Sequence, residues 1–341
     1  MKILGHPKFS RWIASVLFLL ALCTTVHAQT FKYQSFVPAG ATQTIPASIN
    51  ARGDTVGIYF DVKFVQHGYF RSTSGTVFAV DPPDSSGTIA TGIDGAGSIS
   101  GYYGDKNGSY HGFVRKSGGA YISFDAVTDT TLTIALGTNS TGNIVGLFFD
   151  PQGIEHAFLR AQVGTITPFD VPSSLGTVAV AISDAGQIVG NYTDSNEVQH
   201  GFLRGPKGAF RSFDPPASTL TAPTAINRDG QIVGYYLDAS QVQHGFLRNV
   251  EGTIVAIDPP GATSTNVTAI SPDGLAVGYY QTGGTFAQHG FLRNTDGTIV
   301  TLDPPGSTDT SVYGINGNHE IVGNENSHAG VFRGFVFSDV P

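Results

Sequence analysis

Six copies of one polar set recur along the chain, and each contains a histidine, an arginine and an aspartate at fixed spacing. In the fifth copy these residues are His244, Arg248 and Asp258. An imidazole beside a carboxylate can satisfy buried polar atoms or, repeated around a surface, can bind metal ions or other ligands. Catalysis normally needs one asymmetric pocket, so we interpret the set first as structural and second as a ring of binding sites.

The copies keep the same order along the chain. They are His67, Arg71 and Asp81; His111, Arg115 and Asp125; His156, Arg160 and Asp170; His200, Arg204 and Asp214; His244, Arg248 and Asp258; and His289, Arg293 and Asp303. A seventh repeat has Arg333, Phe337 and Phe36 at the matching places, so it lacks all three polar residues at once. This joint loss predicts that the three residues act as one hydrogen-bonded group.

The sequence leaves the pairing inside one copy open. A simple hairpin register places His244 opposite Ile257 and leaves Asp258 on the other face of the sheet. A bulge at Gly252 would bring Asp258 to the histidine's face, and alternatively Asp258 could cap the Pro-Pro turn that follows it.

A second recurrent position places a carboxylate in the loop before the histidine. Its members are Asp61, Asp105, Asp150, Asp194 and Asp238, with Gln281 and Asn326 in the other two repeats. Solvated turn residues are one interpretation, and a face that binds a cation or a polyhydroxyl ligand is the other. No loop has the alternating aspartates and glycine of a calcium loop, so we predict no metal site and no cofactor.

Aromatic residues accompany these loops. Tyr103, Tyr236 and Tyr280 each belong to a tyrosine pair beside the acidic loop and are candidates for stacking on a sugar, with packing between repeats as the alternative. The chain contains no nucleophile elbow, no zinc-protease motif and no phosphate-binding loop. Catalysis would therefore depend on carboxylates that do not repeat.

The elements that would position these groups are short strands. The repeat from Thr224 to Asp258 contains four segments of β-forming residues, which we label A to D, separated by turns rich in Gly, Asn and Asp. The repeat histidines are spaced 44, 45, 44, 44 and 45 residues apart. Such a period indicates a β-propeller or a similar radial array. An open β-solenoid is the alternative, because a period does not show that a ring closes.

The last repeat lacks a fourth strand. Segment A occurs seven times, but the chain ends before the seventh repeat can form segment D, whereas residues 31–36 precede Pro38 as a D segment should. We therefore predict an all-β fold, a seven-bladed β-propeller with four antiparallel strands per blade. The N-terminal strand closes the last blade, so the ring has no free edge.

The repeated motif resembles a known family. His-Ala-Phe-Leu-Arg at His156 and His-Gly-Phe-Leu-Arg at His200, His244 and His289, followed by Gly-Thr-Ile and Asp-Pro-Pro, resemble the bacterial extracellular HAF-repeat family across residues 31–337. The resemblance implies an exported protein built of tandem repeats. It implies no particular activity and no catalytic residues.

The beginning of the chain predicts export. Residues 1–28 combine basic residues, an apolar run and small residues at the end, as in a cleavable signal peptide, and residues 29–341 then form a single propeller domain. The apolar run is too short for a permanent membrane span. The only cysteine, Cys23, lies in the signal, which excludes disulfides, cysteine catalysis and cysteine-bound zinc from the mature protein.

Charge narrows the choice of partners. Three of the 18 Lys and Arg residues belong to the signal, so the net charge of −8 becomes −11 in the mature part. An acidic surface repels phosphate backbones, so we expect no nucleic acid partner. We predict a monomer, secreted to the periplasm or the medium, that serves as a non-catalytic binding module for an extracellular ligand, with carbohydrate as the first candidate. The alternatives are a polysaccharide hydrolase or lyase and a scaffold for protein partners.

Overall fold

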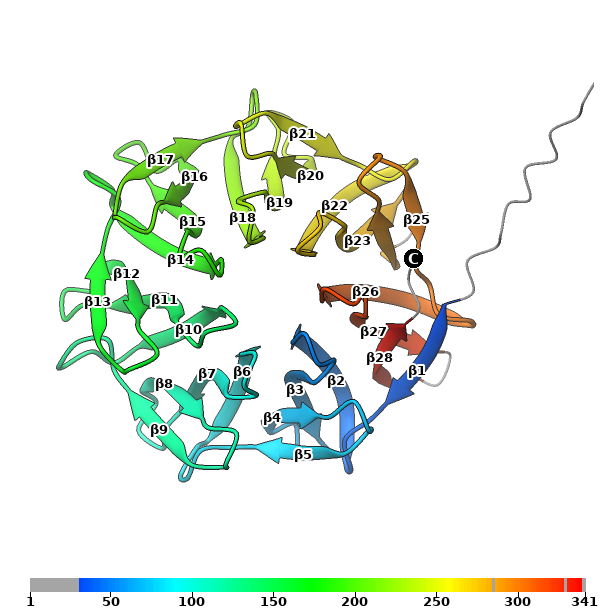
Figure 1. Cartoon of the computed structure of the whole chain (residues 1–341), viewed down its shortest axis with the longest axis horizontal. Helices are drawn as coiled ribbons and strands as arrows, with labels where there is room; N and C mark the ends of the chain where they lie inside the picture. The colour runs from blue at the N-terminus through cyan, green and yellow to red at the C-terminus, as the bar shows by residue number, and fades with distance from the viewer. Residues whose placement is uncertain (1–30, 284–285, 328–329, 339–341) are drawn as a thin grey trace, which may run out of the picture. The chain divides into compact units, whose positions relative to one another are not determined.

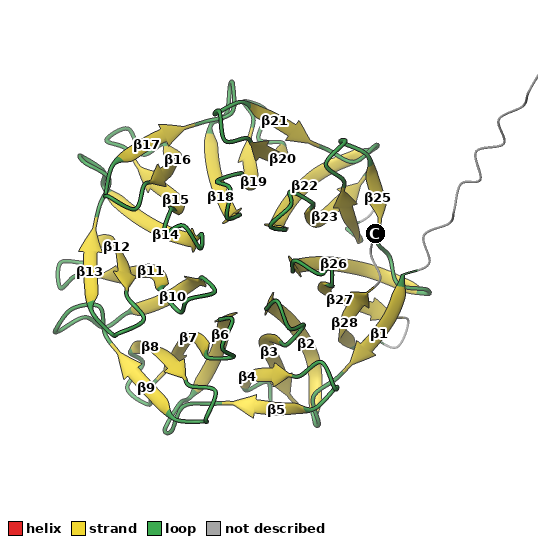
Figure 2. Cartoon of the chain, in the orientation of Figure 1, coloured by secondary structure: helices red, strands yellow, loops and turns green. Residues whose placement is uncertain are grey.

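The computed structural model describes residues 31–283, 286–327 and 330–338, which form 28 strands and no helix (Figures 1 and 2). The predicted signal peptide lies outside the described residues. No helix that could cross a membrane occurs in the described part of the chain.

The strands form seven blades arranged in a ring, each built of four antiparallel strands in the order A, B, C, D (Figure 1). Blade 1 contains β2 (Ala41–Ile49), β3 (Thr55–Asp61), β4 (Gln66–Arg71) and β5 (Val77–Val80), and blade 2 contains β6 (Gly87–Ile93), β7 (Ile99–Gly104), β8 (Tyr110–Arg115) and β9 (Tyr121–Phe124). Blade 3 contains β10 (Thr133–Thr138), β11 (Ile144–Phe149), β12 (Glu155–Arg160) and β13 (Ile166–Phe169). Blade 4 contains β14 (Gly176–Ile182), β15 (Ile188–Thr193), β16 (Gln199–Arg204) and β17 (Phe210–Phe213).

The remaining blades complete the ring. Blade 5 contains β18 (Leu220–Ile226), β19 (Ile232–Leu237), β20 (Gln243–Arg248) and β21 (Ile254–Ile257), and blade 6 contains β22 (Ala262–Ile270), β23 (Ala276–Thr282), β24 (Gln288–Arg293) and β25 (Ile299–Thr301). Blade 7 contains β26 (Ser307–Ile315), β27 (Ile321–Ser327), β28 (Phe332–Ser338) and, as its D strand, β1 (Lys32–Phe36). Single parallel pairs, such as Gln199 with Leu220, also join strand C of one blade to strand A of the next.

The chain closes on itself through blade 7. Strand β1 pairs antiparallel with β28, with Tyr33 opposite Phe337 and Gln34 opposite Val336. The ring of Tyr33 also contacts the rings of Phe335 and Phe337, at centroid distances of 6.1 and 5.7 Å. The predicted fold, including the closing N-terminal strand, is therefore confirmed, and the open solenoid is excluded.

The core lies between neighbouring blades. Strand C of every blade contributes one fully buried aromatic ring, and these rings belong to Tyr69, Phe113, Phe158, Phe202, Phe246, Phe291 and Phe335. Phe291 of blade 6, for example, packs in one cluster with Val233 and Ile257 of blade 5. Burying a side chain of this size contributes about 1.5–3 kcal/mol. The aromatic residue of the repeated tripeptide thus holds the blades together.

Strand B of each blade contains a glycine that packing requires. A Cβ on any of them would overlap the carbonyl oxygen of a strand A residue, and they are Gly57, Gly101, Gly146, Gly190, Gly234, Gly278 and Gly323. In blade 4 the register of strand A shifts between Ala179 and Ala181, beside Gly190. The bulge and the glycine together let strands A and B approach closely.

Candidate functional site

Each repeat histidine is hydrogen-bonded to the aspartate that follows strand D of its own blade. His Nδ1 donates to a carboxylate oxygen over 2.8 Å in blades 1, 2 and 3, 2.7 Å in blades 4 and 6, and 2.9 Å in blade 5. In blade 4, Asp214 also accepts from the hydroxyl of Thr221 over 2.6 Å. The six pairs therefore have nearly the same geometry.

The register of the C–D hairpin explains this pairing. Gly245 lies opposite Ile257 and Arg248 opposite Ile254, so His244 comes level with Asp258. The simple register that sets His244 opposite Ile257 is wrong by one residue. Gly252, with φ of 101°, supplies the additional turn residue, because few other residues adopt this backbone conformation.

The acidic loop residues face the same histidines from the other side. In blade 4, Asp194 Oδ1 accepts from the backbone N–H groups of Asn196 and Val198 over 2.8 and 2.9 Å, which closes the B–C loop. Its second oxygen lies 3.5 Å from His200 Nε2. The corresponding distances are 3.9, 3.7, 3.3 and 3.5 Å for Asp61, Asp105, Asp150 and Asp238. The B–C and D–A loops share one face of the ring, so each of blades 1 to 5 presents an Asp–His–Asp triplet there.

The candidate tyrosines lie against the histidines. Ring centroids are 5.4 Å apart for Tyr103 and His111, 5.2 Å for Tyr236 and His244, and 5.3 Å for Tyr280 and His289. Tyr59, Phe148 and Tyr192 occupy the same place in blades 1, 3 and 4. One face of each ring is thus covered by an imidazole, while the histidine side chains stay 22–34 % exposed.

The triplets shift the proton affinity of their members. Partial burial lowers the pKa of His156, His200 and His244, but hydrogen bonds and charges from the two flanking aspartates outweigh it and raise the pKa. The backbone N–H of Val198 is the main cause that lowers the pKa of Asp194, and His200 adds to it. The same directions hold for Asp61, Asp105, Asp150 and Asp238.

These shifts predict a dependence of stability on pH. Native His200 and His244 hold a proton more tightly than the unfolded chain, in which histidine titrates near 6.5. Their contribution to the free energy of unfolding is complete below that pH and is lost as the pH rises through the native pKa. Urea unfolding across this range should show a falling free energy, and the fall should be smaller in His200→Gln/His244→Gln.

A suitable control is His319, whose Nε2 lies 2.8 Å from Asp273 Oδ2 in the A–B loops. In His319→Asn the free energy of unfolding should fall with rising pH as steeply as in the parent protein, because all six repeat histidines stay in place. If the free energy of unfolding falls equally with pH in the parent protein and in the double glutamine variant, this role for the histidines is contradicted.

The repeat arginines do not join the His–Asp pairs. Each lies at the other end of strand C, and the guanidinium carbons of Arg71, Arg160, Arg204 and Arg248 sit 4.9, 4.8, 4.5 and 5.1 Å above aromatic rings of the preceding D strand. In blade 1 that ring is Phe36 of β1, and Arg71 also donates to Gln34 over 2.7 Å. The arginines therefore connect neighbouring blades, and the sequence group divides into two separate contacts.

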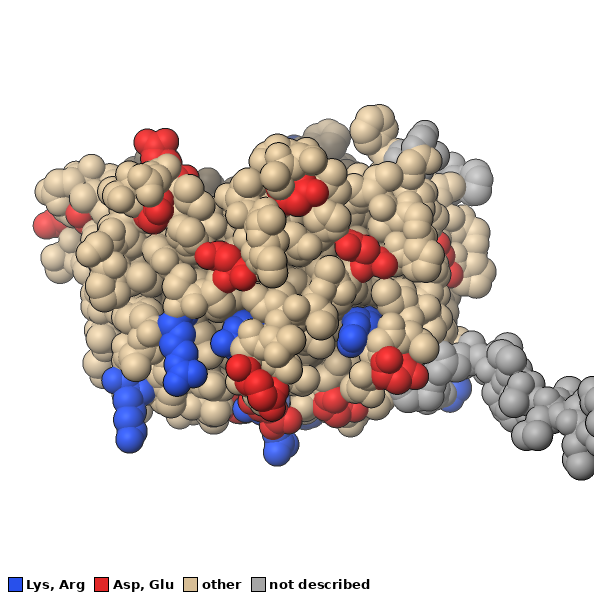
Figure 3. Space-filling view, turned by 90° about the horizontal axis from the view of Figure 1, so that it is seen from above, with Lys and Arg blue, Asp and Glu red and all other residues tan. Residues whose placement is uncertain are grey.

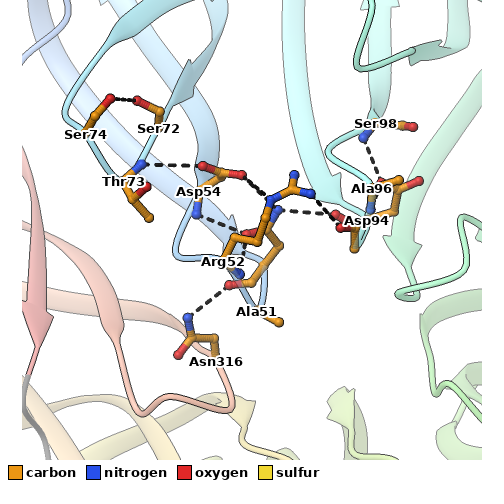
Figure 4. Close-up of polar contacts among 12 residues, drawn as sticks. Ala51, Arg52, Asp54, Ser72, Thr73, Ser74, Asp94, Ala96, Ser98 and Asn316 are labelled. Carbon is orange, nitrogen blue, oxygen red and sulfur yellow. Dashed lines mark hydrogen bonds and ion pairs between the residues drawn. The ribbon is translucent and has the colours of Figure 1, made fainter.

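A second polar ring surrounds the centre of the molecule at the A–B loops. The side-chain amide of Asn316 donates to the carbonyl oxygen of Asn50 over 2.9 Å, and Asn50 donates to that of Asp94 over 3.3 Å (Figure 4). Asn139 and Asn227 make the same contact with the next blade. These asparagines bridge four of the seven blade boundaries. They are absent from the predicted site residues, although their period in the sequence could have identified them.

The A–B loops enclose a central cavity of about 270 Å³. Its lining includes isoleucines from six blades, and among the described residues its only charged side chains are Asp184 and Arg228. Within the described residues, no group of three or more His, Cys, Asp or Glu side chains is placed to hold a metal ion.

Charge is unevenly distributed over the wall of the ring. In the side view of Figure 3 most of the visible Lys and Arg side chains lie in one half of the height, whereas Asp and Glu occur in both halves. The repeat arginines lie at the C–D end of the blades, opposite the Asp–His–Asp triplets. One face therefore carries the Asp–His–Asp triplets, and the other carries the repeat arginines.

Comparison with known proteins supports the fold. No protein-family model and no curated protein matches the chain. Virginiamycin B lyase from Staphylococcus aureus, solved with quinupristin, matches with a TM-score of 0.61 and 13% identity over 90% of this chain and 99% of that one. YCF48 bound to D1 peptide matches with a TM-score of 0.51 and 10% identity over 91% of this chain and 97% of the other.

A puromycin hydrolase gives a TM-score of 0.57 and 11% identity, and the match covers 87% of this chain and 53% of the hydrolase. Identities this low show the fold alone. The chain is a β-propeller. Membership of the HAF-repeat family stays a prediction from the repeated motif.

Proposed function

We propose that this propeller is a secreted, non-catalytic binding module whose B–C and D–A loop face takes an extracellular polar ligand, with a glycan as the first candidate. The observation that carries the proposal is the repetition of one Asp–His–Asp geometry in blades 1 to 5. Each triplet combines carboxylate acceptors with an imidazole edge that is partly exposed.

Repetition favours binding over catalysis. A reaction needs one pocket in which different groups take different roles, whereas equivalent triplets offer equivalent contacts. A polymer with a repeating unit can occupy several such positions at once, and its apparent affinity then exceeds that of a single site. The net negative charge favours neutral or cationic ligands at this face.

Binding to an array of immobilised glycans tests the proposal. The mature protein should be retained without releasing soluble fragments, and His200→Gln/His244→Gln should weaken retention about tenfold or more, because charge-assisted contacts are lost at two positions. His319→Asn, which changes a histidine on the opposite face, should bind like the parent protein. Release of sugar fragments would instead support a hydrolase or lyase. Co-purification of an exported protein without glycan binding would support a scaffold.

A further inference from the structure

A notch between blades 1 and 2 combines two arginines with two aromatic rings. Its volume is about 270 Å³, and it is lined by Arg52, Phe70, Phe78, Gly97, Arg115 and Ser117. It opens where the A–B and C–D turns meet, on the face opposite the Asp–His–Asp triplets. Two guanidinium groups and a hydroxyl thus share one small hollow, and no carboxylate of a described residue belongs to the lining.

Arg115 lies between two aromatic rings. Its guanidinium carbon is 4.8 Å from the ring centroid of Phe78 in blade 1 and 5.8 Å from that of Tyr121 in its own blade. Stacking on the rings orients the guanidinium through its faces, whereas its five N–H donors lie in the plane and point away from the rings. Within the described residues no carboxylate lies within ion-pair distance of Arg115. Apart from its hydrogen bond to the Tyr121 side chain, its donors therefore remain available to a ligand in the notch.

Arg52 is held in place by two contacts at its inner side. Its Nε donates to Asp54 Oδ2 over 3.0 Å, and its Nη1 donates to the carbonyl oxygen of Gly95 in blade 2 over 2.8 Å (Figure 4). The side chain is 50% exposed, and the Nη2 group lies beside Gly97, where a side chain would collide with it. The two contacts thus orient the guanidinium before a ligand arrives.

The second arginine makes this notch unique among the repeats. The residues at the place of Arg52 in the other blades are Ala96, Thr141, Ala185, Asp229, Asp273 and Asn318. Arg204 in blade 4 is stacked like Arg115, between Phe169 and Phe210 at 4.5 and 5.9 Å, but the preceding blade has Thr141 at the place of Arg52. A feature that departs from an otherwise regular repeat at one position is not required for the fold.

We propose that this notch binds an oxyanion, either the carboxylate of an acidic sugar or an inorganic sulfate-type ion. A guanidinium can donate two parallel hydrogen bonds to such oxygens, and these bonds replace the hydration that the anion loses on binding. Asp54 balances the charge of Arg52, so Arg115 supplies the net positive charge of the notch. Phe78, 37% exposed, offers an apolar surface to the remainder of a sugar ring. The site is separate from the triplets of the proposed function and needs none of their residues.

Calorimetric titration of the full mature protein at low ionic strength tests the site with three probes, sodium glucuronate, sodium sulfate and glucose. Glucuronate should bind and glucose should not. Arg115→Gln should raise the Kd for glucuronate about tenfold or more, since a charge-assisted contact is lost. Arg204→Gln, the matched change in blade 4, should leave this Kd unchanged.

The probes also distinguish the sources of the oxyanion. Binding of sulfate as well as glucuronate identifies a general oxyanion site, and binding of glucuronate alone identifies a site for acidic sugars. Should Arg115→Gln fail to fold, Arg52→Gln provides the same test at a half-exposed loop position. An unchanged Kd in the Arg115 or Arg52 variant, equal binding of glucose, or no binding of either anion would overturn the proposal. His200→Gln/His244→Gln should retain glucuronate binding, which separates this result from the proposed function.

Discussion

Removing residues 31–36, which include strand β1, is expected to lower the free energy of unfolding by about 5 kcal/mol or more. Truncating one large core side chain alone costs about 3–5 kcal/mol, and the deletion removes a whole strand. Phe36, which lies 5.7 Å from the ring of Tyr69 and beneath Arg71, would be lost together with five backbone pairs to β28. Strand β28 would then become an exposed edge.

Chemical unfolding followed by circular dichroism measures this effect. A synthetic peptide of residues 31–38, added in excess to the truncated protein, should restore part of the lost stability, because it can pair with β28 as an added strand. A truncated protein as stable as the intact one would show that ring closure contributes little and would contradict a stabilising role for β1.

Gly190→Ala is expected to cost about 3 kcal/mol or more, at the upper end of what overpacking of a core costs. A Cβ at this position would overlap the carbonyl oxygen of Val178 on the neighbouring strand, and a backbone atom cannot move aside as a side chain can. Since the same arrangement recurs in all blades, Gly146→Ala in blade 3 should have a similar effect.

Gly118→Ala is the matched control, because no atom lies within 4 Å of the position that its Cβ would take and its φ is not in the left-handed region. We expect a change within about 0.5 kcal/mol. Thermal melts of the three variants measure the difference. Comparable melting temperatures for Gly190→Ala and Gly118→Ala would mean that strands A and B can separate without penalty.

The fold could be predicted because the sequence repeats with a nearly constant period. The spacing of the histidines set the length of one blade, and the spare strand at residues 31–36 matched the missing strand after Phe337. Both features can be recognised from the order of segments along the chain, because each repeat has the same order. The pairing of Tyr33 with Phe337 then follows from the need to leave no free edge.

The contacts of the site were less predictable. They change when the pairing of strands C and D shifts by one residue, and some of the partners lie in another blade. The one additional turn residue near Gly252 decides whether His244 meets Asp258 or Ile257. The arginine of the repeat set contacts an aromatic ring of the preceding blade, a partner that no local spacing indicates. Both contacts are determined by the folded arrangement of the strands and blades.

The arrangement of blade 7 has a consequence for the order of folding. Blades 1 to 6 each consist of one continuous segment, whereas the contact between Tyr33 and Glu325 joins positions 292 residues apart in the chain. Local sheets can form while synthesis continues, but the ends can meet only after β28 has been made, and contacts between such distant segments form slowly. A chain arrested before Phe332 would expose β1 to pairing with a second molecule.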